Sequence, residues 1–256
     1  MSESQKIIKI VAIALAMFII ILIINGFFFA ISLFSKSNRG SINFSEYYSN
    51  INNIEIDANK SSVKIVKGDK FLVEASGVSN NFKVRNKNNK LEIEENGNWL
   101  FNSSGEIIIY VTNNLNELVI DGGNGKINID SIIANHLELD IGAGLIEINE
   151  STFYNSEIDG GAGLLKATST SFTNLDLDAG IGKVELDGEI LGNSKIDGGI
   201  GEINLNLTNE SLYRFIIDSG IGVVKINEKK VSSVYGNGQN LINIDNGIGT
   251  IYIKIN

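Results

Sequence analysis

The chain contains no cysteine, no proline and a single histidine among its 256 residues. Without cysteine there are no disulfides, thiolate zinc sites or thiol nucleophiles. With His136 as the single histidine, the chain has almost none of the residues that a histidine metal site or a Ser-His-Asp mechanism requires. Basic residues are also in the minority, since the net charge is −9, whereas a nucleic-acid partner requires a basic surface. These absences predict a protein with no nucleic-acid partner and no catalysis of these types.

Charge is absent from one long apolar run, Ile10–Ser35. About 20 apolar residues cross a bilayer as a helix, and this run is longer than the apolar region of a cleaved signal peptide. It also ends in bulky residues, among them Phe27, Phe28 and Phe29. The sequence therefore predicts an uncleaved membrane anchor. A short tail before the anchor and a long polar body after it favour a body outside the cell.

The expected organisation has three parts. Residues 1–39 form a cytoplasmic tail and transmembrane anchor, residues 40–52 form a polar linker, and residues 53–256 form a repeat domain. We expect a single-pass protein of the cell membrane.

The repeat is the motif Asp-x-Gly-x-Gly, which recurs at steps of 19, 19, 19, 19, 21 and 27 residues. A period near 20 residues is typical of stacked repeat architectures. The motif begins at Asp121, Asp140, Asp159, Asp178, Asp197, Asp218 and Asp245.

Apolar residues recur at fixed positions around each Asp. In the copy at Asp178, they are Leu177 one residue before it, and Val184 and Leu186 six and eight residues after it. Such alternation indicates half-buried strands. We expect inward positions at −3, −1, +1 and +3 and then at +6 and +8, so the alternation changes face across Gly-x-Gly. Glycine permits the corner that this change requires.

Stacked repeats of this kind bury a common core that one repeat cannot. The fold class predicted is therefore all-β, a single-stranded β-helix or β-solenoid with coils of about 19–21 residues, preceded by one transmembrane helix. A third segment of each coil offers one large apolar residue, namely Phe153, Phe172 and Leu191. Asn155, Asn174 and Asn193 stand four residues before successive Asp residues and are expected to form an amide ladder.

The solenoid is expected to begin before the first full motif. Residues 54–65 (IEIDANKSSVKI) have the same register around Asp57, with Asn59 and Ser61 in place of the glycines. Strand-like runs follow at residues 71–75, 90–94 and 106–111, and the stretch around Trp99 is expected to be a loop or edge cover.

The segment GIGK, Gly180–Lys183, is similar to part of a phosphate-binding loop. Such a loop needs a helix N-terminus and a Ser or Thr after the Lys. Val184 follows Lys183, and the next element is expected to be a strand. GIGK is therefore interpreted as one corner of the repeat, and no nucleotide site is expected.

These patterns resemble a bacterial family of uncharacterised Gly-rich β-strand-repeat proteins that are usually labelled putative adhesins. The resemblance covers residues 53–256 and rests on IEIDANKSSVKIVKGD, KLEIEE, EIIIYVTNNLNELVIDGGNGKINID and the Asp-x-Gly-x-Gly coils. The family's usual proline is absent from the segment IIIYVTNN. The resemblance implies a β-helix-like body at the cell envelope, and it carries over no catalytic residues.

Two alternatives remain open for the Asp residues of the motif. They either accept backbone N–H bonds at the corners or bind calcium weakly. His136 is expected to be a solvated turn residue. The chain is expected to be a non-enzymatic binding or structural protein of the envelope, with glycans, envelope components or surface proteins as partners. The alternative is a polysaccharide-processing enzyme with a carboxylate pair. No catalytic, metal or cofactor residue is assigned.

Overall fold

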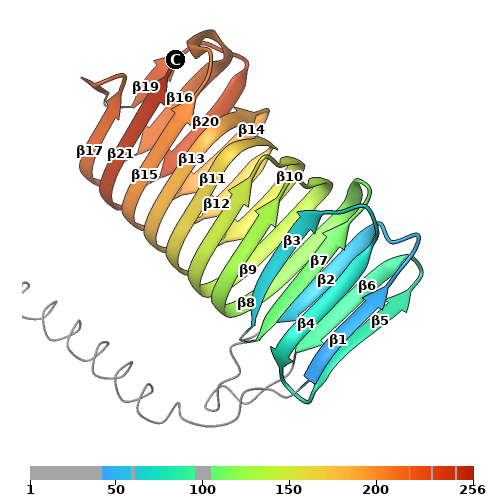
Figure 1. Ribbon diagram of the computed structural model, residues 1–256. Helices are drawn as coiled ribbons and strands as arrows, with labels where there is room; N and C mark the ends of the chain where they lie inside the picture. Colours follow the sequence, from blue (N-terminus) through green and yellow to red (C-terminus); the bar gives the residue numbers. More distant parts are fainter. Residues whose placement is uncertain (1–41, 59–60, 96–104, 219, 232, 246) are drawn as a thin grey trace, which may run out of the picture. The chain divides into compact units, whose positions relative to one another are not determined.

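The computed structural model describes residues 42–58, 61–95, 105–218, 220–231, 233–245 and 247–256. Their strands wind into coils whose two long sides form two facing sheets (Figure 1). We call them the front sheet and the back sheet. Residues 1–39, predicted to form the cytoplasmic tail and transmembrane anchor, lie outside the described residues, as does the stretch around Trp99.

The back sheet contains the strands that lead into each Asp. Its order across the hydrogen-bonded neighbours is β5 (Phe82–Lys87), β6 (Lys90–Glu95), β2 (Asn53–Ala58), the first half of β8 (Leu115–Asp130), the first half of β9 (Ile133–Asn149), the end of β10 (Thr152–Asp159), β12 (Leu175–Asp178), β14 (Asn193–Asp197), β20 (Asn240–Asp245), β16 (Tyr213–Asp218) and β19 (Val234–Gly236).

The front sheet contains the strands that follow each Gly-x-Gly corner. Its order is β1 (Ile42–Tyr47), β4 (Leu72–Val78), β7 (Glu106–Val111), β3 (Ser62–Lys67), the second halves of β8 and β9, β11 (Ala162–Thr173), β13 (Ile181–Leu191), β15 (Ile200–Leu207), β21 (Ile248–Ile255), β17 (Ile221–Ile226) and β18 (Lys229–Lys230). One short 3-10 helix, Glu210–Leu212, precedes β16.

Parallel pairing in exact repeat register holds the coils together. Asp159 lies opposite Asp178, and Leu165 lies opposite Val184. Leu177, Val184 and Leu186 are buried, with at most 2% of each residue exposed, as the sequence predicts. The inward side chains of both sheets form one apolar cluster. The predicted all-β solenoid is thus confirmed for the repeat body.

The spatial order of the coils differs from their order in the sequence. β20 lies between β14 and β16, and β21 lies between β15 and β17. The segment at residues 240–256 is therefore inserted between two coils that precede it in the chain. The step of 27 residues before Asp245 accommodates the return, because β18 and β19 form antiparallel pairs with β17 and β16 in that interval.

The coil at Asp57 has the predicted register. Ile56 lies opposite Ile120, and Asp57 lies opposite Asp121. The predicted strand-like runs correspond to β4, β6 and β7. Part of the segment predicted as a linker is instead a strand, since β1 pairs with β4 and Ile51 is fully buried. The reason is that a few apolar residues in this polar stretch pack against the body.

A short third side of the coil is formed by the start of β10 and the ends of β11 and β13. Phe153 and Phe172 are fully buried, and their rings stack with centroids 5.6 Å apart. The prediction that Leu191 continues this row is wrong. Ile190 lies opposite Phe172 and is fully buried, because the register shifts by one residue between Thr168 and Thr170.

Candidate functional site

The corner residues form the first candidate site, a row of aspartates along the stack. Neighbouring coils place the Asp residues opposite one another in the order Asp57, Asp121, Asp140, Asp159, Asp178, Asp197, Asp245 and Asp218. In four of these corners a carboxylate Oδ1 accepts the backbone N–H of the Gly two residues later. The distance is 2.9 Å for Asp178 and Gly180, and the other three are Asp159, Asp197 and Asp218. The predicted local, structural role of these carboxylates is confirmed.

Two members of the row are electrostatically coupled to their neighbours. Partial burial raises the pKa of Asp140, and the carboxylates of Asp159 and Asp121 raise it further. Burial likewise raises the pKa of Asp57, with a contribution from Asp121. The coupling is typical of like charges at coil spacing. Within the described residues, no group of three or more acidic or histidine side chains is arranged to hold a metal ion.

The glycines of the corner are needed for two different reasons. Gly180 has a φ of 55°, in the left-handed region. From the repeat alone, both glycines of the corner would be expected to need such an angle, but for Gly182 this expectation is wrong. Its backbone is not left-handed, but a Cβ there would lie 2.0 Å from the carbonyl oxygen of Gly163 in the preceding coil. Close approach of neighbouring coils therefore excludes a side chain at this position.

The segment GIGK is a corner followed by β13, as predicted. The Lys183 ammonium lies 2.7 Å from Glu185 Oε1 and 3.2 Å from Glu202 Oε1. The lysine thus pairs with carboxylates of its own coil and the next one. No helix N-terminus follows the glycines, so the segment lacks the geometry of a phosphate loop.

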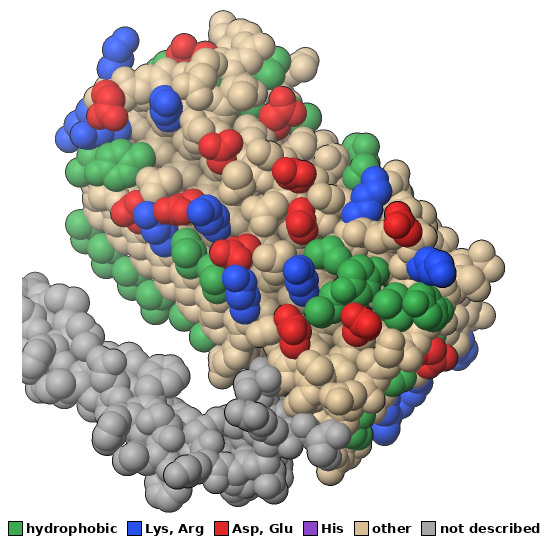
Figure 2. Space-filling view, viewed as in Figure 1, with side chains coloured by type: hydrophobic (Ala, Val, Ile, Leu, Met, Phe, Trp, Pro, Cys, Tyr) green, Lys and Arg blue, Asp and Glu red, His purple; other side chains and the backbone are tan. Residues whose placement is uncertain are grey.

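The corner also corrects the predicted side-chain direction at position +3. Four isoleucines at this position are half or more exposed, with Ile221 the most exposed at 72%. They lie opposite one another in the order Ile181, Ile200, Ile248 and Ile221. Figure 2 shows a row of hydrophobic side chains along this edge. The change of face takes place at the glycine of position +2, before position +3 and not after it as predicted. In the coils of Ile181, Ile200 and Ile221 this glycine is left-handed and already turns the chain.

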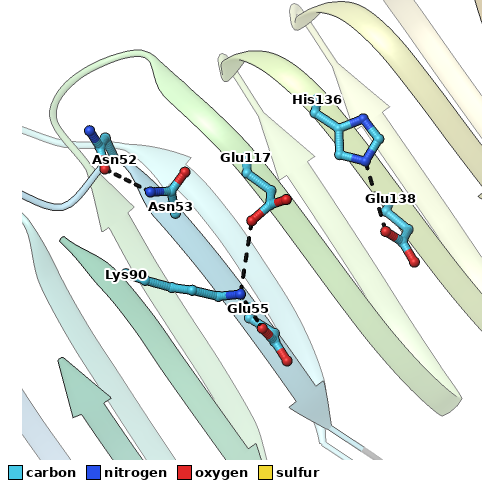
Figure 3. A network of polar contacts seen from close by, with 7 residues as sticks. All are labelled: Asn52, Asn53, Glu55, Lys90, Glu117, His136 and Glu138. Carbon is cyan, nitrogen blue, oxygen red and sulfur yellow. Dashed lines mark hydrogen bonds and ion pairs between the residues drawn. The ribbon is translucent and has the colours of Figure 1, made fainter. Parts of the chain in front are cut away.

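His136 belongs to a strand of the back sheet and not to a turn as predicted. It lies opposite Glu117 and Asn155, and its Nε2 is 3.8 Å from Glu138 Oε2 (Figure 3). Its side chain is 40% exposed. On the same sheet, Lys90 Nζ lies 2.5 Å from Glu55 Oε2, and this contact raises the pKa of Lys90. The His136–Glu138 pair lies within β9, and the Lys90–Glu55 pair joins β6 to β2. Both pairs are largely solvent-exposed and contribute little stability.

The Asn column forms part of the predicted ladder. Asn174 Nδ2 donates to Asn155 Oδ1 at 3.3 Å, so two amides are connected between coils. At the next step, Asn174 Oδ1 accepts the backbone N–H of Asn193 at 3.1 Å. The ladder therefore continues through the backbone at Asn193.

The second candidate site is a groove in the front sheet with a volume of about 730 Å³. It crosses five adjacent strands, β11, β13, β15, β21 and β17, and the turn at Asn227 and Glu228 closes one end. Figure 2 shows acidic and basic side chains interspersed over this sheet. We refer to it as the front groove.

The middle of the front groove is a row of outward side chains at position +7. Pairing in register gives the order Lys166, Glu185, Asn204, Tyr252 and Lys225. The Lys225 ammonium lies 5.7 Å from the centroid of the Tyr252 ring, and the tyrosine is 39% exposed. Asn204 Nδ2 donates to Glu202 Oε1 at 2.5 Å. The groove thus combines one aromatic ring with fixed amide and charged groups.

A second row, at position +9, borders the first. It contains Thr168, Asp187, Asn206 and Lys254 in that order across the sheet. Asn206 Nδ2 donates to Asp187 Oδ2 at 2.6 Å, and Asn206 Oδ1 accepts from Asn256 at 3.2 Å. Hydrogen bonds between coils therefore hold the side chains of Asp187 and Asn206 in one orientation.

The repeat in the sequence contains the column of Tyr252 but does not reveal the front groove. The repeat spacing assigns Tyr252 to position +7 of the last copy, where it is the one aromatic residue of that column. Its neighbours are set by the inserted coil, which places it between Asn204 and Lys225. An aromatic residue in a column of otherwise polar residues was the signal available.

The fold and these surfaces define a β-solenoid with repeated corners and a polar outer sheet. The chain belongs to the Toastrack DUF4097 family, whose model matches residues 51–220 and 100–254. No curated protein is similar enough to the chain to count as a relative.

Three solved structures are similar in part. A putative cell adhesion protein from Clostridium sporogenes shares 17% identity over 84% of this chain and 99% of its own, with a TM-score of 0.35. A putative adhesin from Bacteroides fragilis shares 14% identity over 86% of this chain and 100% of its own, with a TM-score of 0.42. A putative adhesin from Parabacteroides distasonis shares 12% identity over 84% of this chain and 98% of its own, with a TM-score of 0.35.

In the described part of the chain, no helix has the length and apolar character needed to span a bilayer. The run Ile10–Ser35, on which the predicted anchor depends, precedes that part.

Proposed function

We propose that the chain is a membrane-anchored adhesin-like protein whose solenoid is displayed outside the cell and binds a surface partner without catalysing a reaction. The observation that supports this proposal is the front sheet, where outward polar side chains recur at equivalent positions from coil to coil. Such a surface binds through many weak contacts, which add up when several are made at once.

The distribution of the acidic residues also favours binding over catalysis. In the Asp row, equivalent carboxylates stand opposite one another in every coil, and four of them bond to their own backbone. Catalytic carboxylates in glycoside hydrolysis work as one pair with two different roles. A row of equivalent carboxylates offers no such division of roles.

The anchor is proposed from the uncharged run Ile10–Ser35. A tether of this kind would keep the solenoid at the membrane while its outer sheet meets partners. Protease treatment of intact cells tests the arrangement: we expect removal of residues 53–256, and protection of that segment would contradict an outside location.

Binding and catalysis are separated by one experiment. The purified full chain is incubated with immobilised envelope and host polysaccharides and with surface proteins, with and without calcium. We expect retention on at least one polymer with no change in the length of its chains. Turnover abolished by changing one carboxylate would replace this proposal with a polysaccharide-processing enzyme, and no retention on any partner would reject it.

A further inference from the structure

We propose that the front groove is a binding site for a short segment of an uncharged polysaccharide, with Tyr252 as the platform on which one sugar ring stacks. This inference rests on the proposed adhesin function and names the site and the ligand class. It is carried by four observations: the dimensions of the groove, the position of its one aromatic ring, the ordered amides near that ring and the balance of charge.

The dimensions suit a linear chain of sugars. The groove crosses five strands, and adjacent strands lie about 4.8 Å apart, so its length is roughly 19 Å. A pyranose ring in an extended chain advances by a distance similar to one strand spacing. Each sugar of a bound tetrasaccharide would therefore meet the side chains of one coil.

Tyr252 lies on the fourth of the five strands along this path. Asn204 is its neighbour on one side and Lys225 on the other. The Lys225 ammonium, 5.7 Å from the ring centroid, shows that the face of the ring accepts a positively polarised partner. The axial C–H groups of a pyranose carry partial positive charge of the same kind. A sugar ring would thus stack where the ammonium now lies.

The amides beside Tyr252 are held ready for hydroxyl groups. Asn204 is bonded to Glu202, and Asn206 is bonded to Asp187 and Asn256. Because these side chains are already ordered, a ligand would lose less free energy in immobilising them. Amides both donate and accept hydrogen bonds, as the hydroxyls of a sugar do.

The charges of the groove select an uncharged ligand. Three lysines (Lys166, Lys225 and Lys254) and three acids (Glu185, Asp187 and Glu228) line it, although the chain as a whole carries −9. A polyuronate would meet the three carboxylates, and a polyamine sugar would meet the three ammonium groups. Like charges brought together cost free energy, so a neutral chain is favoured.

The test measures binding of tetrasaccharides to the full chain in a detergent without a sugar headgroup. Isothermal titration is carried out with β-1,4-linked tetramers of glucose, N-acetylglucosamine, galacturonate and glucosamine. We expect one or both neutral tetramers to bind more tightly than the acidic and the basic one. Tyr252→Ala should weaken that binding about tenfold, and Tyr252→Phe should preserve most of it.

Tyr154→Ala is the matched control, since Tyr154 is 48% exposed and does not line the groove. It should bind as the unaltered chain does. Equal binding by Tyr252→Ala, or preference for a charged tetramer, would overturn the groove site. If the chain is retained on a polymer but ignores every tetramer, the groove site fails while the adhesin proposal stands. If it is retained on nothing, the adhesin proposal itself fails.

Discussion

At the scale of single residues, the corners of the solenoid are controlled by hydrogen bonds and by the absence of side chains. Asp178 accepts the N–H of Gly180, and Gly180 adopts a φ of 55°. The sequence motif therefore has separate physical parts: the Asp fixes the turn, one Gly supplies the backbone angle, and the next Gly admits the neighbouring coil.

Gly180→Ala should lower the free energy of unfolding by about 1–3 kcal/mol, the scale of strain at such positions. The added Cβ would lie 2.2 Å from the carbonyl oxygen of Gly161, and the left-handed backbone adds strain. Denaturant unfolding followed by circular dichroism measures the change.

Gly160→Ala provides the matched control, because its Cβ would lie 3.7 Å from the nearest atom, in ordinary contact, and its backbone is not left-handed. It should change the unfolding free energy by less than about 0.5 kcal/mol. Equal losses for the two variants would show that the corner tolerates side chains equally at both positions.

At the scale of the strand, the column that faces inward was readable from the sequence wherever the alternation was uninterrupted. Leu177, Val184 and Leu186 are buried as predicted. The prediction failed where the backbone departs from regular alternation. Ile181 points outward because the left-handed glycine precedes it. Ile190, and not Leu191, occupies the buried position opposite Phe172 because the register shifts after Thr168. Alternation in a sequence does not record the angle at a single residue or the residue at which a bulge occurs.

Ile190→Ala should cost about 2–5 kcal/mol of unfolding free energy, the range for a fully buried aliphatic side chain. Ile190 is fully buried opposite Phe172. Leu191 is only half-buried, so Leu191→Ala should cost clearly less. Parallel denaturant melts of the two variants make the comparison, and a greater loss for Leu191→Ala would restore the register predicted from the repeat.

At the scale of the whole repeat body, the order of coils was beyond reach of the sequence. The motif spacing indicates how many coils there are, but it does not indicate which strands pair with one another in the folded protein. Asn204 and Tyr252 are 48 residues apart in the numbering yet lie on adjacent strands. The front groove depends on this adjacency, so the candidate site could not be assembled from the linear order of the copies.

Deletion of residues 240–256 should unfold more than the deleted coil. Among the strands that the structure describes, β16 pairs in parallel with β20 alone and β17 with β21 alone, and their other partners are the short strands β19 and β18. We expect limited proteolysis of the shortened chain to cut within residues 208–239 and to spare the coils up to β15.

A chain that ends at residue 207 is the control, since both shortened chains should leave the same protected fragment. Tyr213 and Phe215, fully buried in the complete chain, should be exposed to solvent in the longer one. Protection of residues 213–226 from protease in the absence of residues 240–256 would contradict this dependence.

The inserted coil also constrains how the protein is made. Ribosomes synthesise residues 213–226 before residues 240–256, yet β20 and β21 occupy the positions between that earlier coil and the rest of the sheets. A nascent chain can therefore add coils one after another only as far as β15. The coil of β16 and β17 cannot pair with the rest of the sheets until residues 240–256 have been synthesised. The final two coils are therefore expected to fold together in a single step.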